Sequence, residues 1–214
     1  MTLRARSLFG LVAAVVFGCG VGLLPLTLPG YNPVTQTVSE IGQAGSPARL
    51  PFTAMLCIIA ACLLIFASAL RDLSVRLGRS PAAAWLTGCM AISVAGVGIF
   101  AFPHPLHNVF GLSELIGYQA PWVLALTWRR LPQTRGLVAF SWLMAVVVWC
   151  AIIANLATLD RSGALWCMEE PVYGIVQRLL FASWFVWLAG ASLLLRGSAL
   201  VAADRSVRVS GAVE

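Results

Sequence analysis

The chain has 214 residues, of which 60% are hydrophobic and only 10% are charged. Soluble domains of this size carry about 25% charged residues, so the composition excludes an ordinary soluble globular protein. The net charge is +6 and comes from arginine, since the chain contains no lysine. The arginines lie in short segments between apolar runs, which is typical of topology determinants and not of a nucleic-acid surface. The sequence therefore predicts an all-α, polytopic membrane protein with one compact helical domain.

A membrane span needs about 20 mostly apolar residues. Six stretches meet this requirement: Leu8–Leu28, Phe52–Leu70, Ala84–Phe102, Leu106–Trp128, Leu137–Leu159 and Val172–Leu195. The fourth stretch is the least apolar, because it contains Glu114, Gln119 and Pro121. Together the stretches predict a six-helix transmembrane domain over residues 1–197, followed by a disordered cytoplasmic tail over residues 198–214.

Arginine is distributed unevenly between the two sides of the predicted bundle. Eleven of the 14 arginines fall at the N-terminus, in the second-to-third and fourth-to-fifth connections and in the tail, against Arg49 and Arg161 on the other side. Because arginine-rich segments stay in the cytoplasm, both termini are expected there, as an even number of spans requires. The sequence therefore predicts a multi-pass protein of a bacterial inner membrane.

The first span carries a row of small residues. Gly10, Ala14, Gly18 and Gly22 lie at successive i+4 positions. Helices associate in lipid through close backbone approach, which small residues allow. We therefore expect this row in the centre of the bundle, against neighbouring helices. Whether the row also supports a homo-oligomer is left open by the sequence.

Two ionisable residues lie inside predicted spans, where an isolated charge is costly. Glu114 in the fourth span and Arg178 in the sixth both lie roughly 10–12 Å below the outer surface, at about 1.5 Å per helical residue. Opposite charges at matched depth stabilise each other, whereas either charge alone would cost several kcal/mol. We therefore predict a Glu114–Arg178 ion pair.

Further polar side chains gather in the same outer half of the predicted bundle. They are His107, Glu114 and Tyr118 on one face of the fourth span, Asn155 in the fifth, and Tyr173, Gln177 and Arg178 in the sixth. Pro121 has no backbone donor and predicts a break in the fourth span near Gly117. Together these residues predict a polar cavity that opens toward the outer side.

The segment from Tyr31 to Pro47 is the longest connection and the least apolar one. Thr37 and Glu40 have the spacing of a capping box, which predicts a short helical turn. We expect the segment to form a short turn or a re-entrant segment that lies over the outer end of the bundle as a lid. Glu40 would then be directed toward His104, His107 or Arg178. The alternative is that Glu40 is a solvated loop carboxylate.

His104 and His107 lie three residues apart and could be read as metal ligands beside a glutamate. However, His104 precedes Pro105 and falls outside the predicted helix, and the spacing is not specific for any metal. A histidine at the membrane interface is the preferred interpretation. The sequence thus predicts neither a metal nor a cofactor.

Three motifs resemble the landmarks of the bacterial family called domain of unknown function 998. They are Thr37-Val-Ser-Glu-Ile-Gly42 followed by Gly45-Ser-Pro47, Phe102-Pro103 followed by His107, and Gly174-Ile-Val-Gln-Arg178. The resemblance extends from about Arg4 to Leu195 and implies a six-helix bundle with polar residues near its outer surface. It also implies that the signature positions of the family are occupied here by Ser39, Glu40, His107 and Arg178.

The chain departs from that pattern at two positions. His104 stands where related sequences often have an acidic residue after the Phe-Pro pair, and Gln177 stands where they often have one before the arginine. The resemblance therefore does not imply a mechanism that needs those carboxylates. The first loop is also similar to that of DRAM-type proteins and GPI-lipid remodelling proteins, which favours lipids as ligands.

Three functions are compatible with these residues. The first is a non-catalytic protein that binds or senses a lipid-like or other hydrophobic molecule, besides the membrane lipids around it. The second is an intramembrane enzyme acting on a lipid or isoprenoid, with Glu40 or Glu114 as general acid or base and His107 as proton relay. The third is a scaffold in which the ion pair is structural. The residues expected to contact a ligand are Ser39, His104, Tyr118, Asn155, Tyr173, Gln177 and Arg178.

Overall fold

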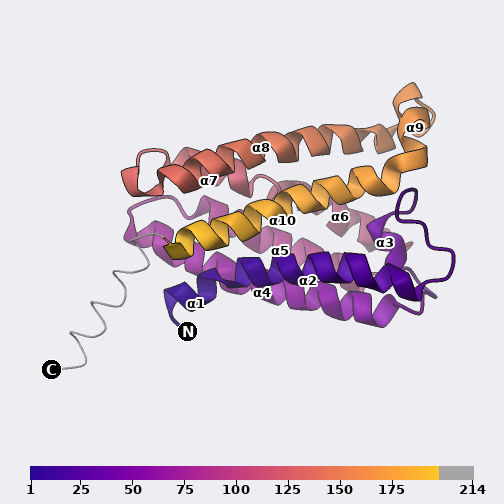
Figure 1. The fold of residues 1–214 in the computed structure, drawn as a ribbon, viewed down its shortest axis with the longest axis horizontal. Helices are drawn as coiled ribbons and strands as arrows, with labels where there is room; N and C mark the ends of the chain where they lie inside the picture. The colour runs from indigo at the N-terminus through magenta and orange to yellow at the C-terminus, as the bar shows by residue number, and fades with distance from the viewer. Residues whose placement is uncertain (198–214) are drawn as a thin grey trace.

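The computed structural model describes residues 1–197 as a bundle of helices, with no strand in that range (Figure 1). The helices are α1 (Leu3–Ser7), α2 (Phe9–Leu23), α3 (Val38–Ile41), α4 (Arg49–Arg76), α5 (Ala82–Ile99), α6 (Pro105–Gly117), α7 (Ala120–Trp128), α8 (Arg135–Asn155), α9 (Ala164–Glu169) and α10 (Tyr173–Gly197). Short 3-10 turns lie at Leu24–Thr27, Pro132–Thr134, Leu156–Leu159 and Glu170–Val172. The predicted tail, residues 198–214, lies outside the described residues.

Six segments of the described chain are long and apolar enough to cross a membrane. They are Leu3–Thr27, Arg49–Arg76, Ala82–Ile99, Pro105–Trp128, Pro132–Asn155 and Ala164–Gly197. Each overlaps one of the predicted spans, so the predicted all-helical class and the number and order of the spans are confirmed. The sixth segment begins earlier than predicted, because α9 and the following turn precede α10 without an intervening loop.

The six segments pack as a closed ring. Helix α2 lies between α4 and α10, α5 contacts α4, α6 and α7, and α8 joins α7 to α10. Helix α1 and the last turn of α10 lie at one end of the bundle, whereas α3 and α9 lie at the other, which we call the lid end (Figure 1). The placement of both chain ends in the cytoplasm stays a prediction from the arginine distribution.

The fourth span is broken where the sequence predicts it. Helix α6 ends at Gly117 and α7 begins at Ala120, with Pro121 in its first turn. Because proline has no backbone N–H, it leaves the carbonyl of Gly117, four residues earlier, without its helical partner. The indole nitrogen of Trp184 on α10 donates to this carbonyl at 3.2 Å. The break is therefore stabilised by a side chain from another span.

The row of small residues on α2 does not lie wholly in the bundle centre. A Cβ atom on Gly10 would come within 2.2 Å of Ser192 Oγ, so this end of the row is packed against α10 as predicted. The prediction is wrong for Gly18 and Gly22, since a Cβ on either would meet no atom within 4 Å. A straight helix turns about 100° per residue, so each i+4 step rotates the row by about 40° and moves it off its neighbour.

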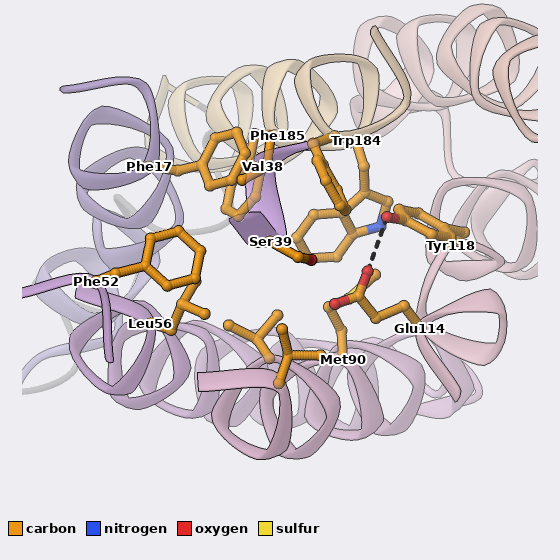
Figure 2. Close-up of a pocket in the computed structure, with 13 residues that line it drawn as sticks. Phe17, Val38, Ser39, Phe52, Leu56, Met90, Glu114, Tyr118, Trp184 and Phe185 are labelled. Carbon is orange, nitrogen blue, oxygen red and sulfur yellow. Dashed lines mark hydrogen bonds between the residues drawn. The ribbon is translucent and has the colours of Figure 1, made fainter. Parts of the chain in front are cut away.

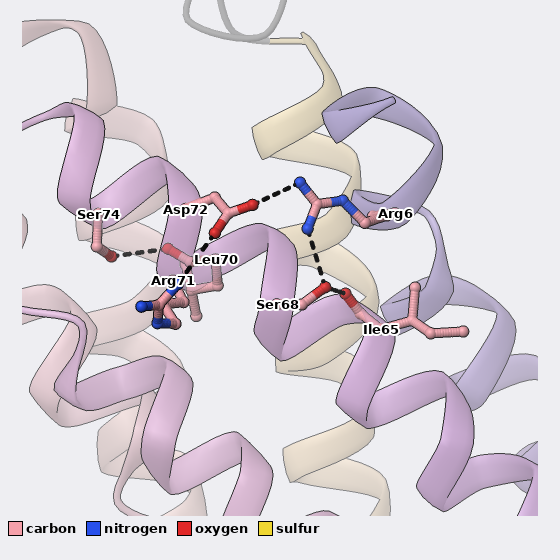
Figure 3. Close-up of polar contacts among 7 residues, drawn as sticks. All are labelled: Arg6, Ile65, Ser68, Leu70, Arg71, Asp72 and Ser74. Atoms are coloured by element: carbon pink, nitrogen blue, oxygen red, sulfur yellow. Dashed lines mark hydrogen bonds and ion pairs between the residues drawn. The ribbon is translucent and has the colours of Figure 1, made fainter. Parts of the chain in front are cut away.

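At the opposite end from the lid, α1 is held to α4 by a charged contact. Figure 3 shows Arg6 on α1 reaching Asp72 and Ser68 on α4. The guanidinium donates to an Asp72 carboxylate oxygen at 2.7 Å and to Ser68 Oγ at 3.1 Å. Asp72 also contacts Arg71 at 3.4 Å, but that arginine side chain is 53% exposed. The Arg6 contact is therefore the one that fixes the start of the chain.

We expect Asp72→Asn to lower the free energy of unfolding by about 0.5–1 kcal/mol, the range of a partly exposed ion pair. The loss arises because Arg6 would keep its desolvation without its anionic partner. Thermal unfolding of the purified protein in detergent measures the effect. Arg71→Gln is the control and should cost less, and an equal or larger effect of Arg71→Gln would contradict the assignment.

Candidate functional site

The predicted Glu114–Arg178 ion pair is not formed. The Glu114 carboxylate accepts a hydrogen bond from Tyr118, whereas Arg178 donates to backbone carbonyls of the first loop. Neither Glu114 nor Arg178 forms an ion pair with another residue in the range 1–197. The prediction failed because equal depth does not fix the direction in which a side chain points around its helix. Arg178 faces the first loop and α2, and Glu114 faces the bundle interior.

Arg178 and its neighbours bind the first loop to α10. One terminal nitrogen of Arg178 donates to Pro33 O and to Gln36 O, both at 2.8 Å. The Gln177 side-chain oxygen accepts from the backbone nitrogen of Val38 at 2.7 Å. The residues Gly174, Gln177 and Arg178, together with the loop segment 31–38 that they bind, are called the latch below.

Gly174 is the position at which the latch requires glycine. A Cβ atom there would lie 2.4 Å from Gln36 O, 2.5 Å from Pro33 O and 2.8 Å from Val34 O. Backbone oxygens cannot move aside as a flexible side chain can, so any side chain would displace the loop. The Gly174–Arg178 motif therefore matters for docking the first loop, a role that the sequence motif alone did not reveal.

Tyr31 is the latch residue whose role the sequence did not predict. Its hydroxyl accepts a short hydrogen bond from the second terminal nitrogen of Arg178 and donates to Thr37 O at 2.7 Å. Burial raises the pKa of the Tyr31 phenol, and the guanidinium of Arg178 opposes this rise only in part. The phenol is therefore neutral at physiological pH and available as a donor. Its position at the start of the polar loop was the only signal in the sequence.

Glu40 is engaged within its own turn. Its carboxylate accepts hydrogen bonds from the Thr37 backbone nitrogen and, at 2.9 Å, from Thr37 Oγ1. The predicted capping box is thus present at the start of α3. The expectation that Glu40 is directed to the histidines or to Arg178 is wrong, because capping the turn uses the carboxylate. The neighbouring Ser39 instead faces the interior.

Glu114 lies in a small cavity at the centre of the ring, beneath α3. Figure 2 shows it with Tyr118, whose hydroxyl donates to one carboxylate oxygen at 3.0 Å, and with Ser39 on the facing wall. Glu114 and Tyr118 are 7% and 4% exposed. The remaining lining is apolar: Phe17, Val38, Phe52, Leu56, Met90, Val94, Val97, Phe181, Trp184 and Phe185. The cavity has a volume of about 30 Å³. It is therefore small and largely apolar, and not the polar cavity that was predicted.

A larger groove runs along the outside of the bundle between α2 and α10. Its volume is about 610 Å³, and Tyr31, Pro33 and Arg178 of the latch line one end. The rest of the lining is apolar or small: Ala14, Phe17, Gly18, Val21, Gly22, Pro25, Leu26, Ala182, Phe185, Val186 and Ala189. The open Gly18 and Gly22 thus belong to this groove. Phe17 and Phe185 line both spaces, and their rings stack at 4.2 Å between centroids.

The two histidines make hydrogen bonds that stabilise the start of α6. His104 is its N-cap and accepts from Leu106 N at 3.1 Å, and a His107 ring nitrogen lies 2.8 Å from Phe100 O. His107 is buried on the same helix face as Glu114, but neither histidine lines the cavity or the groove. Residues 1–197 contain no group of three side chains that could hold a metal.

Asn155 and Tyr173 form a separate contact between α8 and α10. The Tyr173 hydroxyl donates to Asn155 Oδ1 at 3.4 Å, and the Asn155 amide donates to Ala151 O and Val176 O. Neither residue lines the cavity or the groove. The polar residues that the sequence placed in one site are therefore divided among the latch, the cavity, the α6 cap and this contact.

A ring of six helices, each long and apolar enough to cross a membrane, defines a multi-pass integral membrane protein. The chain belongs to the family described as protein of unknown function (DUF998), whose model matches residues 11–194. The match confirms the resemblance carried by the first-loop, Phe-Pro and Gly174–Arg178 motifs. No curated protein and no solved structure matches the chain. The family description names no activity, so function is inferred below from the groove and the cavity.

Proposed function

We propose that this membrane protein binds an amphiphile with an anionic headgroup in the groove between α2 and α10. The headgroup would lie at Arg178 and Tyr31, and the apolar tail would lie along Gly18 and Gly22. The observation that carries the proposal is that Arg178 has no acidic partner among residues 1–197 and lies at one end of an apolar groove.

The charge of Arg178 favours an anionic ligand. A guanidinium has five N–H donors, and its hydrogen bonds here go to neutral carbonyl oxygens and to the Tyr31 hydroxyl. These partners satisfy donors but leave the positive charge uncompensated. A phosphate or carboxylate group would supply the missing negative charge in a low-dielectric setting, where charge-assisted hydrogen bonds are strong.

The remainder of the groove fits an apolar chain. Its volume of about 610 Å³ lies within the range of about 300–1,000 Å³ that is usual for ligand sites. Leu26 and Val186 on its rims are 80% and 53% exposed, so the groove is open at the outer surface of the bundle. In a membrane this surface faces lipid, and an amphiphile could enter sideways without leaving the bilayer.

The alternative of a structural scaffold loses its main support. That hypothesis depended on an ion pair between Glu114 and Arg178, which the structure does not contain. The enzyme hypothesis keeps Glu114 as a candidate acid or base, but Glu40 and His107 lie outside the cavity. Ligand binding in the groove needs neither of those residues.

The proposal is tested by native mass spectrometry of the protein released from nanodiscs that contain equal amounts of an anionic and a zwitterionic phospholipid with the same acyl chains. We expect the retained lipid to be predominantly the anionic one. The preference should fall as salt is added, because part of the interaction is electrostatic. Equal retention of the two lipids at low salt would contradict the proposal.

A further inference from the structure

The small cavity beneath α3 contains hydrogen-bond donors and acceptors that have no protein partner. Tyr118 donates to one oxygen of the Glu114 carboxylate, and no residue in the range 1–197 bonds to the other oxygen. The Ser39 hydroxyl likewise has no hydrogen bond within the described chain. Figure 2 shows the oxygen atoms of Ser39 and Glu114 directed into the same space from opposite walls.

The other polar groups around the cavity are already paired. The Trp184 indole donates to Gly117 O at 3.2 Å, and the Tyr118 hydroxyl is committed to Glu114. Glu114 is 7% exposed and Ser39 is partly exposed, so both polar groups border this small space. Polar atoms in such surroundings are nearly always bonded to protein or to ordered water. The unused hydrogen-bonding positions of Ser39 and Glu114 therefore favour a bound group.

The size and lining of the cavity restrict what that group can be. The volume of about 30 Å³ admits one or two water-sized groups, and the walls are otherwise apolar. A hydroxyl group has one donor and two acceptor positions, so it can donate to Glu114 and accept from Ser39 at the same time. An anionic group would be desolvated here beside the Glu114 carboxylate with no counter-ion and is disfavoured.

We propose that the cavity is a binding site for one neutral hydroxyl group, held between the free carboxylate oxygen of Glu114 and Ser39 Oγ and supplied by water or by an alcohol. This site is separate from the groove, since the stacked rings of Phe17 and Phe185 lie between the two spaces. A hydroxyl held by a carboxylate is also the arrangement from which a general base removes a proton.

X-ray radiolysis of the purified protein in detergent tests for water in the cavity, because hydroxyl radicals made from a bound water label the side chains next to it. We expect oxidation of Trp184 and Met90, which line the cavity although they are 1% and 2% exposed. Trp187, on the same helix, is 0% exposed and outside the cavity, so it should stay unlabelled and serves as the internal control.

Two variants test whether the oxidation of Trp184 depends on Ser39 and Glu114. Ser39→Ala and Glu114→Met each remove one partner, and the label at Trp184 should fall about fivefold or more, as expected for the loss of roughly 1 kcal/mol of hydrogen bonding. Glu114→Gln keeps a hydrogen-bonding side chain and should retain most of the label. Size-exclusion chromatography checks that each variant is folded and monodisperse.

Labelling and organic extraction of the same purified protein distinguish water from an alcohol as the source of the hydroxyl. If an alcohol occupies the site, Trp184 stays unlabelled, and organic extraction should yield a neutral alcohol in stoichiometric amount that Ser39→Ala no longer retains. Labelling that depends on both partners supports water, and a retained alcohol supports the alcohol. Absence of both, or labelling unchanged in Ser39→Ala and Glu114→Met, would overturn the proposal.

Discussion

Gly18→Leu is expected to reduce retention of the anionic amphiphile by about tenfold or more, equivalent to at least about 1.4 kcal/mol of binding free energy. The new side chain would extend into the groove between α2 and α10, where the apolar tail is proposed to lie. A Cβ at this position has no protein atom within 4 Å, and the rest of the side chain has the open groove to occupy. Stability should therefore stay within about 0.5 kcal/mol of the wild type, as for substitutions that disturb no packing.

The matched control for this substitution is Gly88→Leu. Gly88 also lies in a membrane-crossing helix, and a Cβ there likewise meets nothing within 4 Å, but the residue does not line the groove. Lipid retention should be unchanged in Gly88→Leu. Native mass spectrometry from the mixed-lipid nanodiscs provides the comparison. Equal loss in both variants, or no loss in Gly18→Leu, would remove the groove as the binding site.

The second large effect is expected from Gly174→Val, which should release the first loop from α10. The added side chain would overlap three backbone oxygens of the loop at 2.4–2.8 Å. Overpacking against such rigid atoms costs about 2 kcal/mol, which corresponds to a roughly 30-fold larger open population of the loop. Hydrogen–deuterium exchange of residues 31–38 measures this opening, since the Val38 amide donates to Gln177 on α10 and the Gln36 amide donates to Asn32 O within the loop.

Gly111→Val is the appropriate comparison for the latch variant. Gly111 lies within α6, and a Cβ there has no atom within 4 Å, so the same substitution should leave exchange in the first loop unchanged. Exchange in the spans should remain slow in both variants, because the loop opens without unfolding the ring. If Gly174→Val leaves exchange of residues 31–38 at the wild-type rate, the latch does not hold the loop.

Local features of the sequence predicted local features of the structure well. The Thr37–Glu40 capping box and the break at Pro121 both depend on residues within one turn of each other, and both are present. Contacts between spans were predicted less well. Arg178 was assigned to Glu114 from depth alone, but its partners are main-chain carbonyls, which carry no signal in a residue pattern. The docking role of Gly174 was hidden for the same reason.

The sequence by itself determined the class of the protein, the six spans and their order, because apolar length and charge are properties of each segment alone. It also identified Glu114 and Arg178 as ionisable residues inside apolar spans, and the family resemblance pointed to Ser39. The tertiary structure decided which of these residues meet. The direction of each side chain depends on how six helices rotate against one another when they pack, and that rotation separates Arg178 at the groove from Glu114 and Ser39 in the cavity.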